Sequence, residues 1–268
     1  MQKLLVLTDL HICAPGKQIV GLDPAARLKD VLHTAILAHP DAAGLILMGD
    51  LTHHGRPEEY DVLRHILADL EIPVVLMVGN HDKRDVFFAA FPDAQKTRSG
   101  HVQTTWDLGN HRIITLDSLD GPPYPDGHHA GRLCADRIAY LQDALDTKGD
   151  RHALICVHHP PFATGIVGMD QIKLADGDRF LNILRNYSDV HLLCGHVHRT
   201  ISGTSRGVSW SMLKSTCHQG VLDLSTPNPH LSTNASGAFG LVLLTEGTVV
   251  VHSEDVDVPG VSIFGGYS

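Results

Sequence analysis

Short apolar runs alternate with amphipathic stretches through the N-terminal part of the chain. Residues 4–8, 44–48 and 74–78 are mainly apolar and have the length of buried strands. Between them, apolar residues recur at helical spacing over 23–38 and over 57–70. This β-α-β-α-β order predicts parallel strands joined by right-handed crossovers.

The alternation of apolar and amphipathic stretches continues to residue 194. The segments 101–107 and 112–117 flank Gly109-Asn110, which predicts a hairpin. Residues 118–132 are rich in Gly, Pro and His and should form a long loop. The other elements expected in this part are helices over 84–91, 134–146 and 178–187, and strands at 153–157 and 190–194.

Beyond residue 200 the apolar runs become short and are separated by turn residues, which favours antiparallel pairing. We expect residues 201–268 to complete the second of two sheets, and the polar segment 223–238 to form an exposed loop or a C-terminal cap. The strands expected here are 200–204, 208–213, 220–224, 241–245 and 248–253. The predicted fold class is α/β: a four-layer αββα sandwich of two mixed sheets with helices outside. We expect residues 1–268 to form a single domain, because polar strand ends come from both halves.

Five of the predicted strands end in residues of the kinds that bind metal ions. The carboxyl ends of parallel strands meet at one edge of a sheet, so these side chains should lie close together. If residues 8–11 stay extended, Asp9 and His11 point the same way. The candidates, taken in chain order, are Asp9, His11, Asp50, Asn80, His158, His196 and His198. Oxygen and nitrogen ligation without thiolate suits Mn, Fe, Zn or Co. Each short pattern could by itself be an ordinary turn or a surface histidine, but that interpretation has to account for all five.

Composition narrows the range of partners. The net charge is −9 and no block of consecutive Lys or Arg occurs, which disfavours polymeric nucleic acid as a substrate. The five cysteines form no C-x-x-C pair, which indicates a reducing compartment rather than a disulfide framework. No apolar run approaches the length that spans a bilayer. We therefore expect a cytoplasmic protein that does not act at a membrane.

These motifs also carry a family resemblance. Five of them, over roughly residues 4–200, resemble the signature of the calcineurin-like metallophosphoesterases: Asp9-Leu10-His11, Gly49-Asp50, Gly79-Asn80-His81-Asp82, His158 and Gly195-His196-Val197-His198. The resemblance implies one metal held by Asp9, His11 and His198, and a second held by Asn80, His158 and His196. Asp50 would bridge the two. It further implies hydrolysis of a phosphate ester by a metal-bound hydroxide, with two divalent or mixed-valence ions about 3.5–4 Å apart.

The same resemblance assigns a role to His81, which matches an active-site histidine that is not a ligand. We expect His81 to stabilise the phosphoryl group or to protonate the leaving alkoxide, with Asn80 also contacting the substrate. The alternative is that His81 only supports a ligand through a hydrogen bond. Asp82 is expected to orient a neighbouring histidine.

The subgroup is suggested by three further motifs. Residues 55–60 (Gly-Arg-Pro-Glu-Glu-Tyr), residues 158–162 (His-His-Pro-Pro-Phe) and Met169-Asp170 resemble the class III cyclic nucleotide phosphodiesterases and, equally, the related glycerophosphodiesterases. Residues 215–219 also resemble that branch, which places His218 near the substrate. His218 could instead be a plain strand-end histidine.

The sequence thus predicts a two-metal phosphodiesterase acting on a small diester, with a 3′,5′-cyclic nucleotide favoured. The alternatives are a glycerophosphodiesterase, a broad phosphodiesterase or phosphomonoesterase, and a non-catalytic scaffold, which is disfavoured because every ligand position is filled. A homodimer or higher homo-oligomer is expected from the resemblance alone.

Overall fold

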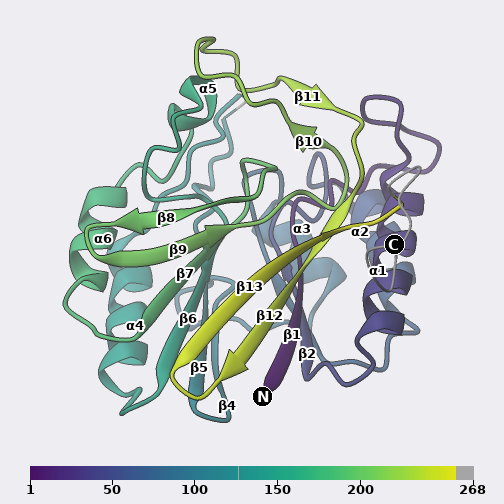
Figure 1. The fold of residues 1–268 in the computed structure, drawn as a ribbon. Coiled ribbons are helices and arrows are strands. Elements are labelled where there is room, and N and C mark those ends of the chain that lie inside the picture. The colour runs from purple at the N-terminus through teal and green to yellow at the C-terminus, as the bar shows by residue number, and fades with distance from the viewer. Residues whose placement is uncertain (126, 258–268) are drawn as a thin grey trace, which may run out of the picture.

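The computed structural model describes residues 1–125 and 127–257 of the chain. Its core is two sheets packed face to face, with helices on both outer surfaces (Figure 1). Three clusters of buried apolar residues fill the spaces between the layers, one between the sheets and one under each group of helices. This is the four-layer αββα sandwich that the sequence predicts.

The first sheet has five strands in the order β13-β12-β1-β2-β3. Its strands are β1 (Gln2–Leu7), β2 (Gly44–Met48), β3 (Val74–Met77), β12 (Ala238–Thr245) and β13 (Thr248–Asp255). The pairs β1–β2 and β2–β3 are parallel, as expected from the crossover helices between them. The helices α1 (Pro24–Ala38), α2 (Pro57–Leu67) and α3 (Arg84–Ala90) lie along this side of the molecule (Figure 1).

The second sheet has six strands in the order β4-β5-β6-β7-β9-β8. Its strands are β4 (Thr104–Leu108), β5 (His111–Leu116), β6 (His152–Val157), β7 (Val190–Cys194), β8 (Ile201–Ser205) and β9 (Val208–Met212). Its helices are α4 (Ala135–Asp146), α5 (Val167–Asp170) and α6 (Gly177–Leu184). The predicted hairpin is confirmed, because β4 pairs antiparallel with β5 around Gly109-Asn110.

Local sequence explains the elements that lead into the site. All five residues of β2 are buried, because helices cover one face of its sheet and the second sheet covers the other. The start of α1 is fixed by Asp23, whose carboxylate accepts hydrogen bonds from the backbone N–H groups of Ala25 and Ala26 at 2.9 and 3.2 Å.

The C-terminal part differs from the expectation that residues 201–268 complete the second sheet. β8 and β9 do join that sheet, but β12 and β13 belong to the first, where β12 pairs antiparallel with β1. The physical reason is that β12 covers an edge of β1 that would otherwise be an exposed apolar strand edge. Residues 258–268 lie outside the described residues.

The expected strand 220–224 is also much shorter. Only β10 (Gln219–Gly220) forms, and it pairs with β11 (Ser232–Thr233) at the base of a projecting segment. We call residues 219–233 the arm; in Figure 1 it lies at the top of the molecule, beside α5. Its polar residues bond locally, as where the Asp223 carboxylate accepts hydrogen bonds from Ser225 and Thr226, and such bonds compete with a strand ladder.

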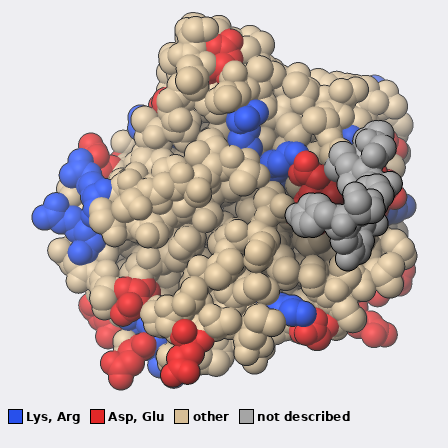
Figure 2. Space-filling view, viewed as in Figure 1, with Lys and Arg blue, Asp and Glu red and all other residues tan. Residues whose placement is uncertain are grey.

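Charged side chains are sparse over the face formed by β8, β9 and β13 (Figure 2). Lys, Arg, Asp and Glu gather mostly toward the periphery of this view, and no stripe of basic residues crosses it. The described residues visible on this face therefore form no basic groove for a nucleic-acid backbone.

Candidate metal centre and active site

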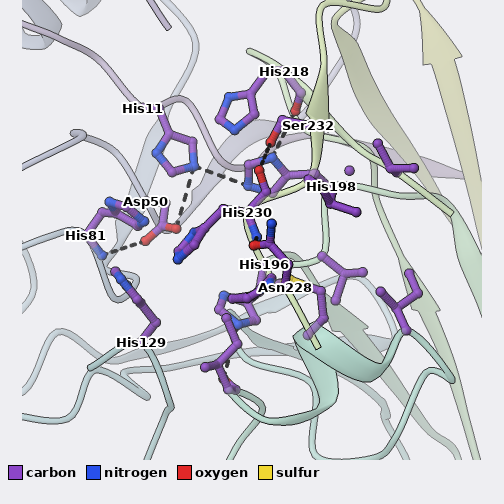
Figure 3. Close-up of a pocket in the computed structure, with 18 of the residues that line it drawn as sticks. His11, Asp50, His81, His129, His196, His198, His218, Asn228, His230 and Ser232 are labelled. Carbon is purple, nitrogen blue, oxygen red and sulfur yellow. Dashed lines mark hydrogen bonds and ion pairs between the residues drawn. The ribbon is translucent and has the colours of Figure 1, made fainter. Parts of the chain in front are cut away.

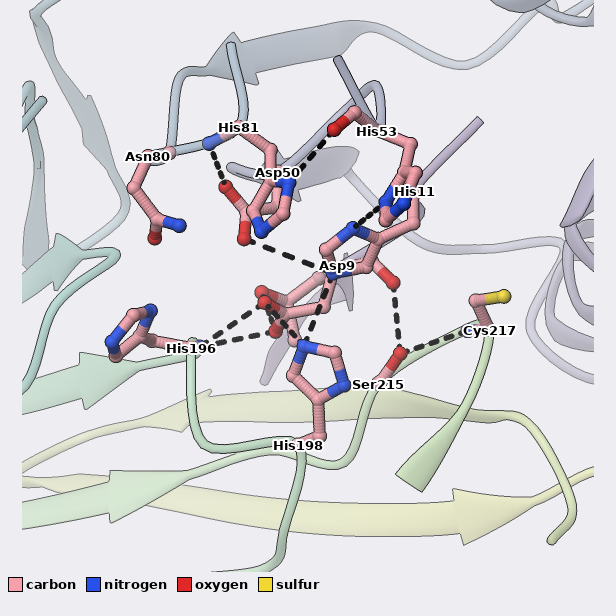
Figure 4. A network of polar contacts seen from close by, with 12 residues as sticks. Asp9, His11, Asp50, His53, Asn80, His81, His196, His198, Ser215 and Cys217 are labelled. Carbon is pink, nitrogen blue, oxygen red and sulfur yellow. Dashed lines mark hydrogen bonds and ion pairs between the residues drawn. The ribbon is translucent and has the colours of Figure 1, made fainter. Parts of the chain in front are cut away.

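The structure brings the predicted ligands together at the carboxyl ends of β1, β2, β3, β6 and β7. Four of them, Asp9, His11, Asp50 and His198, have ligand atoms that all lie within 4.8 Å of one another (Figure 4). His158 joins this group because its Nε2 lies 3.3 Å from Asp50 Oδ2. Both sheets therefore contribute to one site.

The backbone at this site is strained in a repeated way. Five of the seven predicted ligands have positive φ angles: Asp9 (56°), His11 (46°), Asp50 (48°), His196 (70°) and His198 (55°). Non-glycine residues rarely adopt this left-handed conformation, and each instance costs about 1–3 kcal/mol. The extended backbone expected for residues 8–11 is thus wrong, because Asp9 and His11 instead turn to bond with the neighbouring loop, where Asp50 O accepts from His11 N at 2.9 Å.

Among Asp9, His11, Asp50 and His198, the contact between the two histidine rings best indicates a cation site. Their Nε2 atoms lie 3.2 Å apart, and His198 Nε2 is also 3.2 Å from Asp9 Oδ1. His198 Nδ1 donates to the backbone carbonyl of His218 at 2.9 Å, so its neutral ring carries no proton on Nε2. Nitrogen lone pairs converging beside a carboxylate form the donor set of a cation site.

Two of the other predicted ligands, Asn80 and His158, each have a buried polar atom without a hydrogen-bond partner among the described residues. These are His158 Nε2 and Asn80 Oδ1. The opposite nitrogens are engaged: His158 Nδ1 donates to Met48 O at 3.0 Å, and Asn80 Nδ2 donates to His129 Nδ1 at 3.0 Å. Buried polar atoms are rarely left unpaired, so both atoms fit a missing ligand such as a cation.

His196, the remaining predicted ligand, would offer a cation its other ring nitrogen, Nδ1. Its Nε2 donates to Ile172 O at 3.1 Å, which leaves Nδ1 unprotonated in the neutral ring. Gly79 explains how these groups approach so closely. A Cβ atom at Gly79 would lie 2.8 Å from His158 Nε2 and would also overlap the Asp50 carboxylate. The site residues thus fit metal ions in donor type, tautomer and space.

The electrostatics favour the same conclusion. Burial alone would raise the pKa of Asp50, but the neighbouring His158 and His81 outweigh it and hold that pKa well below its usual range. Burial would lower the pKa of His158, yet Asp50 and Asp9 raise it to about 9. Burial lowers the pKa of His11 and of His196 well below the usual value. Without a metal the His158 ring is therefore protonated beside the Asp50 carboxylate at neutral pH, and a divalent ion would take the place of that proton.

His81 lies beside the candidate ligands rather than among them. Its backbone N–H donates to Asp50 Oδ1 at 2.9 Å, and its Nδ1 donates to the carbonyl of His53 at 2.8 Å. The ring packs edge-on against His11, with 4.6 Å between centroids. Nε2 is therefore the ring nitrogen left to act on a substrate.

Asp82 does not orient a histidine, which corrects the sequence interpretation. Its carboxylate instead accepts hydrogen bonds from the backbone N–H groups of Gly79, Leu51 and Thr52 and from two hydroxyls, those of Thr52 and Tyr60. Burial and the charge of Asp50 raise the pKa of Asp82 to about 6. Asp82 thus ties the loop after β3 to the loop after β2.

His218 lies at the site, as the family resemblance suggests. Its ring centroid is 4.5 Å from that of His198, and its Nδ1 is buried without a hydrogen-bond partner in the described part of the chain. Sequence reasoning missed three other histidines, His53, His129 and His230, which line a cavity at this site together with His218. The only signals for them were the total of 20 histidines and the His53-His54 and His128-His129 doublets.

Comparison with known proteins decides the family. The family model described as "Calcineurin-like phosphoesterase" matches residues 2–200. The chain belongs to the calcineurin-like phosphoesterase family. Members of this family use divalent metal ions, so the expectation of a metal-dependent phosphodiesterase is confirmed at the level of the family.

Named relatives place this phosphoesterase within the family. It is 39% identical over 253 residues to a probable cyclic nucleotide phosphodiesterase of Rhodopseudomonas palustris, covering 93% of this chain and 91% of that one. It is 30% identical over 220 residues to the glycerophosphodiester phosphodiesterase GpdQ of Enterobacter lignolyticus, covering 80% and 77%. Both branches expected from the sequence are thus represented among its relatives.

A solved structure supports the fold. A dimetal phosphatase from Danio rerio superimposes with a TM-score of 0.71 at 17% identity, covering 95% of this chain and 96% of that one. Of the helices in the described part of the phosphoesterase, none combines the length and the hydrophobicity that crossing a bilayer requires.

Proposed function

We propose that this protein is a two-metal phosphodiesterase that hydrolyses 3′,5′-cyclic nucleotides. One metal would be held by Asp9, His11 and His198, and the second by Asn80, His158 and His196, with Asp50 between them. Mn, Fe, Zn and Co suit this mixture of oxygen and nitrogen donors. The observation that carries the proposal is the pair of unpartnered buried atoms, His158 Nε2 and Asn80 Oδ1, beside the Asp50 carboxylate.

Two bound divalent cations would supply an acidified water and neutralise the charge that builds on the phosphoryl oxygens. The chain's own residues prepare for this by fixing their ligand atoms in advance. The carbonyls of Met48, Ile172 and His218 each accept the ring N–H of one candidate ligand, which sets its tautomer and orientation.

His81 would then act on the leaving group. The His53 carbonyl fixes the ring through Nδ1, and the Asp50 carboxylate fixes the backbone of the same residue. When the imidazole is protonated, Nε2–H can donate to the leaving oxygen as its bond to phosphorus breaks. Asn80 and His218 would contact the same phosphoryl group.

The choice of substrate is supported by the named relatives. The R. palustris relative aligns over nearly the whole chain and carries the name of a cyclic nucleotide phosphodiesterase. A second candidate is a glycerophosphodiester, because the GpdQ relative is 30% identical over most of the chain.

Phosphorus NMR tests both candidates in one tube. The Mn-loaded protein is mixed with equal amounts of cyclic AMP, glycerophosphocholine and a simple phosphomonoester, and the Asp50→Asn variant serves as the control. We expect the cyclic AMP signal to decay first and the variant to be inactive. Faster decay of glycerophosphocholine would move the assignment to the second candidate. Stable diester signals would overturn the assignment as a phosphodiesterase, and an Asp50→Asn variant with full turnover would overturn the two-metal mechanism.

A further inference from the structure

The arm, residues 219–233, is fastened to the candidate metal centre at its base. The Gly220 N–H donates to the carbonyl of His198 at 3.2 Å, and Arg199 donates to the carbonyl of Gly220 at 2.9 Å. The strands of the arm continue this pairing, with Val221 N donating to Leu231 O at 3.1 Å. The arm therefore starts from the loop that carries two candidate ligands.

The far end of the arm rests on α5. A Cβ atom at Gly168 would lie 2.6 Å from the carbonyl carbon and oxygen of Asn228, so the two backbones touch there. The segment leading into α5 is itself fixed, because the Asp170 carboxylate accepts hydrogen bonds from Thr164 N at 2.7 Å and Gly165 N at 3.0 Å. The arm and α5 thus form a continuous wall.

A cavity of about 260 Å³ lies between this wall and the histidines (Figure 3). On the side of α5 and the arm its lining contains five aliphatic side chains, Ile166, Met169, Ile172, Val221 and Leu231, and the arm adds polar ones, Asp223, Asn228, His230 and Ser232. Asn228 and Ser232 of the arm line the same cavity as His196 and His198, and all four are labelled in Figure 3. The cavity therefore has a polar end at the candidate ligands and, along α5 and the arm, a wall that combines aliphatic side chains with a few polar groups.

The composition of the lining discriminates between substrates. Among the described residues that line the cavity there is no Trp, Tyr or Phe, although aromatic faces are what recognise a choline group. The lining also has no Lys or Arg to pair with a second phosphate. Its carboxylate outside the candidate ligands, Asp223, already accepts hydrogen bonds from Ser225 and Thr226. Aliphatic walls with a few polar groups suit a flat heteroaromatic ring instead.

We propose that Met169 and Ile172 on one side and Leu231 on the other enclose the base of the nucleotide, while its phosphate meets the histidines. This inference rests on the proposed function and names residues that would favour a nucleotide over a glycerol diester. The arm would act as a fixed wall of the base site.

Binding of two phosphomonoesters that differ only by the base tests this directly. Calorimetry on the Mn-loaded protein compares adenosine 5′-monophosphate with ribose 5-phosphate. We expect the nucleotide to bind at least about 10-fold more tightly to wild type, the range for an apolar group in a fitted pocket. In Leu231→Ser and in Met169→Ser this ratio should fall below about 3-fold, with ribose 5-phosphate binding unchanged.

The matched control is Leu222→Ser. Leu222 lies on the same arm but is 61% exposed and does not line the cavity, so its substitution should preserve the ratio. Equal affinity of the two ligands for wild type would overturn the base site, as would an unchanged ratio in both Leu231→Ser and Met169→Ser. Failure of the proposed function would look different, because it would appear as stable diester signals in the NMR experiment whatever the two binding constants are.

Discussion

The side-chain amide nitrogen of Asn80 donates a hydrogen bond to Nδ1 of His129 at 3.0 Å. This contact commits the nitrogen end of the amide and leaves Oδ1 as the end available to a cation. His129 is itself fixed, because its backbone carbonyl accepts a hydrogen bond from His159 Nε2 at 3.1 Å. A loop distant in the sequence thus orients a candidate ligand.

Substituting His129 with Ala should therefore weaken metal binding. Removing a residue that orients a ligand usually costs about 10–100-fold in metal affinity, and we expect that range for His129→Ala in a Mn²⁺ titration followed by calorimetry. The control is His128→Ala, whose ring pairs with Asp120 at 3.0 Å instead. Equal Mn²⁺ affinity in both variants and in wild type would show that His129 does not orient Asn80.

Substituting His81 should lower turnover without lowering the metal content of the protein. Because its ring bonds to the His53 carbonyl and not to the candidate ligands, His81→Asn should keep its metal content. Turnover should fall by about 10²–10⁴-fold, the usual effect of losing a proton-transfer group. Metal analysis and steady-state kinetics on the same sample measure both quantities, and His54→Asn, at an exposed neighbouring position, is the control. A parallel loss of metal would instead make His81 a support for the metal site.

The layers of the fold could be predicted because local pattern and tertiary environment agree. The uninterrupted apolar residues of β2 and the Asp23-Pro24 start of α1 each point to the element that forms. The partner of β12 could not be predicted, because its apolar residues would fit an edge of either sheet. Which sheet β12 joins depends on which sheet has an unpaired edge strand, and the spacing of apolar residues within β12 gives no information about that.

The candidate ligands could be predicted because each lies within a few residues of the carboxyl end of a strand. Their environment could not, since it depends on contacts across long stretches of chain. The hydrogen bond between Asn80 and His129 joins residues 49 apart in the sequence. The positive φ angles of Asp9 and Asp50 occur where the loop after β1 is hydrogen-bonded to the loop after β2. Asp82 was misjudged for the same reason, because several of its partners, the backbone N–H groups of Leu51 and Thr52 among them, lie about 30 residues away.

The cysteine thiols should differ strongly from one another in their rate of alkylation near neutral pH. Burial would raise the pKa of Cys134, but hydrogen bonds from Arg137 outweigh it and lower that pKa, so the thiolate fraction at neutral pH increases. Burial raises the pKa of Cys156 and of Cys217 to about 12, which keeps both protonated. Iodoacetamide at pH 7.5 should therefore label Cys134 first in the native protein, as read by peptide mass spectrometry.

Two controls accompany the labelling experiment. Cys134→Ser should abolish the fast native-state labelling, and urea should make the buried thiols react, because unfolding removes the burial that raises their pKa. Similar labelling rates for all thiols in the native protein would contradict the assigned environments.

Arg84 and Asp117 form a buried ion pair that fixes the loop 118–132. Arg84 Nε and Nη2 donate to the two carboxylate oxygens of Asp117 at 2.6 and 2.7 Å, and both side chains are nearly inaccessible. The same guanidinium also donates to the carbonyls of Leu119 and Gly121. One residue near the Gly-Asn-His-Asp loop thus holds the start of the loop that carries His129.

Breaking this pair should be costly. Arg84→Met leaves the Asp117 charge buried without its main partner, which typically costs about 3–5 kcal/mol in the free energy of unfolding. The matched control is Arg64→Met, which removes a pair with Asp61 that is more than half exposed and should cost less than about 1 kcal/mol. Urea denaturation followed by circular dichroism compares the two variants. If Arg84→Met lost no more stability than Arg64→Met, the loop would be held by other contacts, and the effect of His129 on Asn80 would have to be independent of this ion pair.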